Sequence, residues 1–133
     1  MRNLISLLRE VGLQPTPQRL AVAQYVLATT SHPTADEVFE KARKKCPTLS
    51  RATVYNTLAR LSEKGLVRPQ TIREGVVVFD AYMEKHHHFI DEDTGTIHDV
   101  PWGDLVVSGA ENLREYEIRE YQVVMRGRRR RRA

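Results

Sequence analysis

The stretch that decides the fold reads Ser50-Arg-Ala-Thr-Val-Tyr-Asn-Thr-Leu-Ala-Arg-Leu-Ser-Glu-Lys-Gly65. Its first residue is a favourable helix N-cap, and its last residue is a favourable helix terminator. Val54, Leu58 and Leu61 recur at the spacing of one face of a helix. The stretch therefore predicts an amphipathic helix over residues 51–64.

The segments on either side extend this helix into a domain. After it, two short strands are predicted over residues 66–71 and 76–80, with a turn between them that contains Gly75. Before it, capping residues and helical apolar spacing predict three further helices. They cover residues 2–11, 17–28 and 34–45. Helices followed by a β-hairpin are typical of a winged helix-turn-helix, which binds double-stranded DNA.

The outward face of the helix over 51–64 is suited to DNA. Asn56 can pair with adenine, Arg51 can reach guanine or phosphate, and Tyr55 can contact a thymine methyl group or phosphate. The alternative is an ordinary amphipathic helix whose polar face is only solvated. We predict DNA contacts for Arg19, Arg51, Ala52, Thr53, Tyr55 and Asn56.

A second informative stretch runs from Asp80 to Asp99 and contains three consecutive histidines. In a strand, His86 and His88 share one face and His87 takes the other. A hairpin turn at Asp93-Thr94-Gly95 would bring Asp99 beside His88, although a slip of one residue would turn it away. Imidazole and carboxylate ligands predict a transition-metal site; the alternative is a surface cluster of histidines.

The remaining chain predicts a small second unit. A helical stretch is expected near residues 104–113 and a last strand over 117–125. Because three strands and one helix bury little apolar surface, this unit is expected to pair with a second copy as a homodimer.

Composition agrees with a DNA-binding protein. Residues 1–84 carry a net charge of +4, residues 85–125 carry −6, and six arginines follow in the last eight of the 133 residues. The arginine tail is expected to be disordered, with accessory attraction to DNA. The single cysteine, Cys46, excludes an internal disulfide, and no apolar run could span a bilayer. These features predict a cytoplasmic protein without a membrane segment.

Taken together, motifs along the chain resemble the ferric uptake regulator family. They are Thr16-Pro-Gln-Arg19, His32-Pro-Thr-Ala-Asp36, Ser50 to Leu58, Gly65-Leu-Val67, Val78-Phe-Asp80 and His86-His-His88. The resemblance implies a homodimeric, metal-dependent repressor that binds an inverted-repeat operator. It also implies an α+β fold with a winged helix at 1–80, a hinge at 81–85, an α/β dimerisation and metal-sensing domain at 86–125, and an Arg-rich tail at 126–133.

Carried over residue by residue, the family's regulatory metal site falls on His32, Asp80, His86, His88 and Asp99. Fe(II) or Mn(II) would be the sensing ion, with Zn(II) as a substitute in vitro. Three histidines and two aspartates resemble the peroxide-sensing branch. There, iron-dependent oxidation of a ligand histidine releases DNA, and His32 and His86 are the candidates for this oxidation.

The chain also departs from the family pattern. Asp91 and Thr94 stand where a structural zinc site needs a CxxC, so no structural zinc is expected. The histidine triplet and the arginine-rich end resemble the iron response regulator branch, which makes a haem-responsive or iron-responsive regulator the alternative. An oxygenase built on two histidines and a carboxylate is the enzymatic alternative. With no visible substrate pocket and a winged helix before the site, the prediction is that the protein is not an enzyme.

Overall fold

A computed structural model describes residues 3–81 and 84–131 of the chain. The backbone divides into two compact units, Met1–Met83 and Glu84–Ala133, and each is described here by itself. The predicted hinge and the end of the predicted arginine tail fall partly on residues 82–83 and 132–133. These lie outside the described residues.

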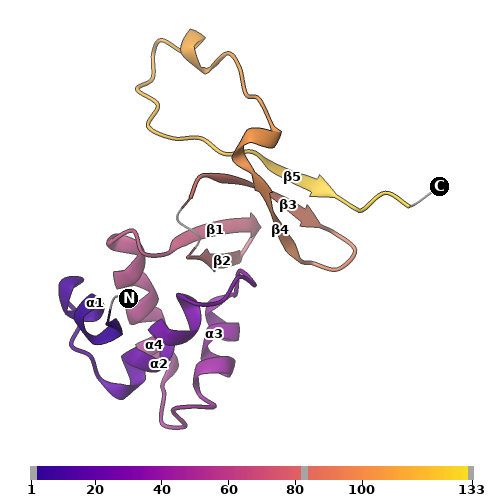
Figure 1. Ribbon diagram of the computed structural model, residues 1–133. Helices are drawn as coiled ribbons and strands as arrows, with labels where there is room; N and C mark the ends of the chain where they lie inside the picture. The colour runs from indigo at the N-terminus through magenta and orange to yellow at the C-terminus, as the bar shows by residue number, and fades with distance from the viewer. Residues whose placement is uncertain (1–2, 82–83, 132–133) are drawn as a thin grey trace. The chain divides into compact units, whose positions relative to one another are not determined.

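The first unit begins with helices α1 to α4 (Figure 1). Their bounds are α1 Leu4–Glu10, α2 Pro17–Val26, α3 Ala35–Ala42 and α4 Arg51–Glu63. The predicted caps are confirmed: Thr16, Thr34 and Ser50 each accept a backbone N–H from the first turn of their helix. Thr34 and Glu37 also form the predicted capping box. Among the described residues, no helix combines the length and apolar character needed to cross a bilayer.

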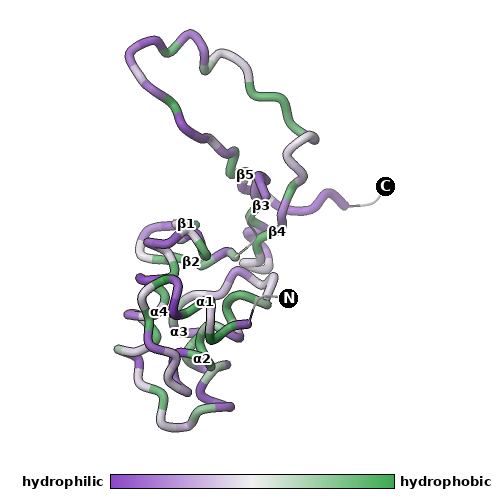
Figure 2. The backbone as a smooth tube through the Cα atoms, turned by 60° about the vertical axis from the view of Figure 1, so that its left-hand side comes forward, coloured by the Kyte–Doolittle hydropathy of each residue, from purple (hydrophilic) through white to green (hydrophobic). Residues whose placement is uncertain are grey.

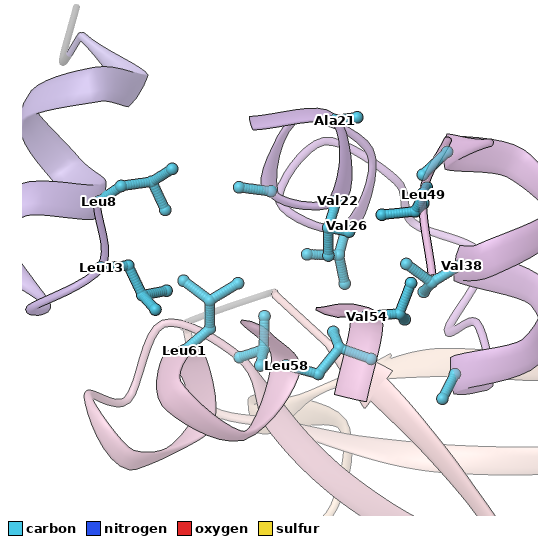
Figure 3. Close-up of a cluster of buried hydrophobic side chains, with 14 of the residues drawn as sticks. Leu8, Leu13, Ala21, Val22, Val26, Val38, Leu49, Val54, Leu58 and Leu61 are labelled. Carbon is cyan, nitrogen blue, oxygen red and sulfur yellow. The ribbon is translucent and has the colours of Figure 1, made fainter. Parts of the chain in front are cut away.

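One apolar core joins these helices. Figure 3 shows side chains from all four helices pointing into a common interior. Val54, Leu58 and Leu61 of α4 are each at most 1% exposed, which confirms the buried face predicted for this helix. Burying each such side chain contributes roughly 1.5–3 kcal/mol, so the core holds α4 with its opposite face outward.

A two-stranded antiparallel hairpin completes the first unit. Strand β1 covers Arg68–Arg73 and β2 covers Val76–Asp80. Gly75 has a φ of 75°, which a side chain would disfavour, and it allows the tight turn between them. Four helices followed by this hairpin confirm the predicted winged-helix arrangement.

The second unit is a three-stranded sheet in the order β4-β3-β5 (Figure 1). Strand β3 covers His86–Asp91, β4 covers Ile97–Pro101 and β5 covers Val124–Gly127. The β3–β4 pair is antiparallel and sets His88 opposite Asp99, so the predicted register is confirmed. Strand β5 pairs with β3 in parallel. The molecule is therefore α+β, as predicted.

Two predicted elements of the second unit are wrong. In place of a helix over 104–113, the chain forms only short 3-10 turns, Trp102–Asp104 and Ala110–Asn112. Gly109 interrupts the segment at a φ of 98°, a left-handed conformation through which an α-helix cannot continue. The strand predicted over 117–125 forms only from Val124 to Gly127.

The segment between β4 and β5 instead forms a long loop that leaves the sheet and returns to it (Figure 1). Figure 2 shows hydrophobic and hydrophilic residues interspersed along it. Val106 is 93% exposed and Tyr116 is 66% exposed. A short helix is marginal in water without a surface to pack on, and the described part of the chain offers none here.

A buried carboxylate closes the turn between β3 and β4. Asp91 Oδ1 accepts hydrogen bonds from the backbone N–H groups of Asp93, at 3.0 Å, and Thr94, at 3.4 Å. Gly95 follows with a φ of 73° and donates its N–H to the Asp91 carbonyl at 2.7 Å. In the family that this chain resembles, the first cysteine of a CxxC stands at the position of Asp91. Its carboxylate organises the turn through hydrogen bonds.

We expect Asp91→Ala to lower the free energy of unfolding by about 1–3 kcal/mol, because the turn loses a buried acceptor for two backbone N–H groups. Urea denaturation followed by circular dichroism measures this change. Asp91→Asn keeps an acceptor oxygen at the same place, and its free energy of unfolding is expected to fall by less. An unchanged urea midpoint for Asp91→Ala would contradict the structural role.

Candidate functional site

The first unit places a histidine beside a carboxylate. His32 Nε2 lies 3.4 Å from Asp80 Oδ2, and both side chains are buried. His32 has a φ of 53° and is the one non-glycine residue with a positive φ in the described ranges 3–81 and 84–131. Such a conformation costs on the order of 1–3 kcal/mol and is typical of functional positions.

Backbone contacts explain how these two residues meet, although they lie far apart in sequence. The Phe79 N–H donates to the Pro33 carbonyl at 2.8 Å, and Thr34 forms a β-bridge with Val78. The loop before α3 is therefore attached along β2, and Asp80 is the last residue of that strand. The winged hairpin thus holds the His32–Asp80 pair.

The second unit brings together three further candidate ligands. His86 Nε2 lies 3.1 Å from His88 Nε2 and 3.4 Å from Asp99 Oδ1, and His88 Nε2 lies 3.6 Å from the same oxygen. The alternation of β3 puts the two rings on one face, and the pairing of β3 with β4 supplies the carboxylate. Both histidines are buried.

Hydrogen bonds on the far side of each ring determine which nitrogen can bind an ion. His86 Nδ1 lies 2.6 Å from the Glu84 carbonyl, which can only accept, so Nδ1 is the donor. His88 Nδ1 lies 3.1 Å from Gln122 Oε1 and donates to it in the same way. In neutral rings, both Nε2 atoms then present lone pairs.

Two nitrogen lone pairs and a carboxylate oxygen therefore face one small volume. Groups of this kind repel each other unless a cation lies among them. Imidazole and carboxylate are ligands for Mn, Fe and Zn, and a hydrogen bond donated by the other ring nitrogen, as both Nδ1 atoms make here, is typical of metal-binding histidines. The residues present therefore fit the predicted ion, to which this unit would contribute two nitrogen ligands from β3 and one oxygen ligand from β4.

The other two histidines of the second unit have different surroundings. His87 points to the opposite face of β3, where its ring stacks on Trp102 at 4.5 Å between centroids. Its Nδ1 accepts the Val123 N–H at 2.9 Å. His98 Nε2 lies 3.1 Å from Thr96 Oγ1. Neither ring belongs to the His86–His88–Asp99 cluster.

Four of the five predicted DNA-contacting residues of α4 lie on one exposed face. Arg51, Ala52, Tyr55 and Asn56 are exposed, and Tyr55 is 54% exposed although its ring is large and partly apolar. Thr53 is half-buried, and its backbone N–H and hydroxyl contact Ser50 Oγ. Thr53 also lines a surface cavity of about 350 Å³, together with Arg19 at the start of α2.

Several supporting residues were missed by the sequence reasoning. The Arg51 guanidinium pairs with Asp36 of α3 and lies over the Phe39 ring at 4.5 Å from its centroid. Gln122 contacts His88 across 34 positions of the chain. Trp102 stacks on His87. No local pattern identifies these residues, because each contact joins segments that only the tertiary fold brings together.

Comparisons with known proteins agree with this architecture. The model of the Ferric uptake regulator family matches residues 10–126. The peroxide-responsive repressor PerR of Staphylococcus epidermidis is 34% identical over 129 residues, covering 96% of this chain and 86% of that protein. Among solved structures, the Campylobacter jejuni peroxide stress regulator has a TM-score of 0.68 at 28% identity, over 99% of this chain and 100% of that one. A zinc-bound manganese uptake regulator has the same fold, with a TM-score of 0.73 at 24% identity over 96% and 99% of the two chains.

Proposed function

Since this chain belongs to the Ferric uptake regulator family, whose members are transcriptional regulators that bind DNA operators and form dimers, we propose that it is a metal-dependent, peroxide-responsive repressor. The observation that carries the proposal is the convergence of His86 Nε2, His88 Nε2 and Asp99 Oδ1 on one volume. The name of the Staphylococcus epidermidis relative supports peroxide as the signal.

The proposed DNA-reading element is α4. Its N-terminal half carries exposed Tyr55 and Asn56, and Arg51 is held by Asp36 and Phe39. Base edges in the major groove are read by side chains of this kind near the start of a recognition helix. The net charge of +4 on residues 1–84 supports attraction to phosphates. The partner would be a double-stranded operator in the cytoplasm.

We further propose that one ion is bound by residues of both units. The first unit offers the His32–Asp80 pair, and the second offers the His86–His88–Asp99 cluster. Only residues 81–85 separate Asp80 from His86, a span of about 20 Å at most. An ion shared by the two sets would fix the orientation of α4 relative to the second unit. DNA and the ion would then favour the same state, and each would raise affinity for the other.

The proposed regulator acts as a homodimer on an inverted repeat. Apolar side chains along the loop between β4 and β5 support pairing with a second copy, because Val106, Leu113, Tyr116 and Ile118 are exposed. A two-fold axis between two copies would match the symmetry of an inverted-repeat operator. No structural zinc is proposed, since Asp91 organises the turn where a CxxC would lie.

Fe(II) or Mn(II) is the proposed sensing ion, and Zn(II) would substitute in vitro. The alternative of haem binding by the histidine triplet is less well supported. His87 points away from His86 and His88 and is held between Trp102 and the Val123 N–H. The triplet therefore does not present three rings to one ligand. A haem-responsive protein would show a Soret band that is lost when His86–His88 are replaced.

Metal-gated DNA binding is tested with an operator selected from random duplexes by the Mn(II)-loaded protein. Fluorescence anisotropy with chelator and with Mn(II) is expected to show an affinity gain of about 5- to 150-fold with the metal. Asn56→Ala should weaken operator binding by about 1–3 kcal/mol and leave Mn(II) affinity unchanged. Equal operator affinity with and without metal would overturn the proposed function.

A further inference from the structure

We propose that Gln122 is a positioning residue for the ligand His88, through a side-chain carbonyl that fixes both the tautomer and the orientation of the imidazole. The inference rests on the proposed metal function of the His86–His88–Asp99 cluster. It adds to that cluster a residue that does not touch the ion. Its failure and the failure of the proposed function give different results in the experiment below.

The contact itself defines the role. Gln122 Oε1 lies 3.1 Å from His88 Nδ1, and an amide oxygen can only accept. Nδ1 therefore carries the proton, and the Nε2 lone pair faces His86 Nε2 and Asp99 Oδ1. In the opposite tautomer, an N–H would occupy the place where the ion binds, so that the ring would have to lose or move this proton first.

The two imidazoles differ in what supports them. His86 Nδ1 donates to the backbone carbonyl of Glu84, which every side-chain replacement would preserve. His88 Nδ1 depends on a side chain, and that side chain comes from the distant segment that precedes β5. Gln122 is thus a position at which the support of the cluster can be changed without changing a ligand.

The residues flanking Gln122 hold it against β3. The centroid of the Tyr121 ring lies 5.0 Å from that of the Trp102 ring, and the Trp102 ring stacks on His87. The Val123 N–H donates to His87 Nδ1 at 2.9 Å, and the Val123 carbonyl accepts the His88 N–H at 3.0 Å. Contacts on both sides therefore hold the backbone of Gln122 next to β3, and from there its exposed side chain reaches His88.

Replacement of Gln122 by leucine removes the acceptor at similar size. We expect Mn(II) affinity, measured by competition with a chelating indicator, to fall about 10- to 100-fold, the loss typical for an outer-shell partner. Gln122→Glu retains an acceptor oxygen, and its Mn(II) affinity should stay within about threefold of the wild-type value, since the hydrogen bond from His88 Nδ1 is preserved. Gln24→Leu, at an exposed position of α2, is the matched control and should bind Mn(II) like wild type.

A second measurement reports the tautomer without metal. Long-range ¹H–¹⁵N spectra of the metal-free protein should show His88 with Nδ1 protonated in wild type and Gln122→Glu, and a shift toward protonated Nε2 in Gln122→Leu. A purely structural role would leave this pattern unmoved. The inference is overturned if Gln122→Leu keeps either the wild-type Mn(II) affinity or the wild-type tautomer, or if Gln122→Glu loses as much Mn(II) affinity as Gln122→Leu. A wild-type protein that fails to bind Mn(II) would overturn the proposed function, whereas the tautomer measurement would still test the role of Gln122.

Discussion

Replacing His88 by alanine is expected to abolish the dependence of operator binding on Mn(II). The replacement removes one of the two nitrogen lone pairs that face the Asp99 carboxylate, so that His86 remains as the one imidazole ligand that the second unit contributes to the proposed site. Because loss of an outer-shell partner alone costs about 10- to 100-fold, loss of a ligand should reduce Mn(II) affinity by more than about 100-fold. Isothermal titration calorimetry measures the affinity for Mn(II), and fluorescence anisotropy measures the affinity for the operator with and without Mn(II).

Controls separate loss of a ligand from loss of the fold. His98→Ala removes an imidazole from the adjacent strand β4, outside the cluster, and should leave Mn(II)-dependent binding intact. Asp99→Asn removes the charge but retains the size of a side chain that is 29% exposed, and it should reproduce the defect of His88→Ala. Matching unfolding temperatures of the metal-free proteins would exclude misfolding. If operator binding by both His88→Ala and Asp99→Asn still depended fully on Mn(II), the proposed metal site would be disproved.

The Fe(II)-loaded protein is expected to lose operator binding after brief exposure to hydrogen peroxide, whereas the Mn(II)-loaded protein keeps it. Bound Fe(II) would supply the redox chemistry that cleaves the O–O bond of the peroxide. One oxygen atom is transferred to the ring carbon of a ligand imidazole and the other leaves as water, so the histidine is oxidised and the peroxide is reduced. The modified ring is a poorer ligand, and affinity for the operator should fall to the metal-free level.

Peptide mass spectrometry identifies the oxidised residue. We expect a mass gain of one oxygen atom on His32 or His86, and none on His98, which lies outside the cluster and serves as an internal control. Anaerobic loading with Fe(II) provides the unoxidised reference. If the Fe(II) form still binds the operator after peroxide treatment and its histidines are unmodified, the protein senses iron and not peroxide. Equal inactivation of the Mn(II) form would show that the oxidation does not need iron.

Local signals explain why most elements could be predicted. The capping box at Thr34 and Glu37 and the N-cap at Ser50 act within a few residues, and both are present in the structure. The turn around Gly95 and the alternation of β3 likewise set His88 opposite Asp99. Each of these features depends on the nearest neighbours in the chain, which a sequence displays directly.

The two incorrect elements show where such signals end. The segment over 104–113 has helix-forming residues, yet Gly109 adopts a left-handed conformation and the Val106 side chain is 93% exposed. Helix formation in a short segment depends on tertiary packing, and packing could not be inferred from the spacing of apolar residues. The same holds for β5, which begins at Val124, where the chain pairs with β3.

The sequence by itself determined the helices and hairpin of the first unit and the strand that carries His86 and His88, because short-range capping, periodicity and turn chemistry specify them. It predicted the pairing of that strand with Asp99 only to within one residue, and the structure fixed the register. Tertiary structure alone decided that Gln122 reaches His88, that Asp36 holds Arg51, and that Pro33 attaches the His32 loop to β2. These contacts join residues between 15 and 46 positions apart. Their partners are selected by how the elements pack, and no pattern within one segment contains that information.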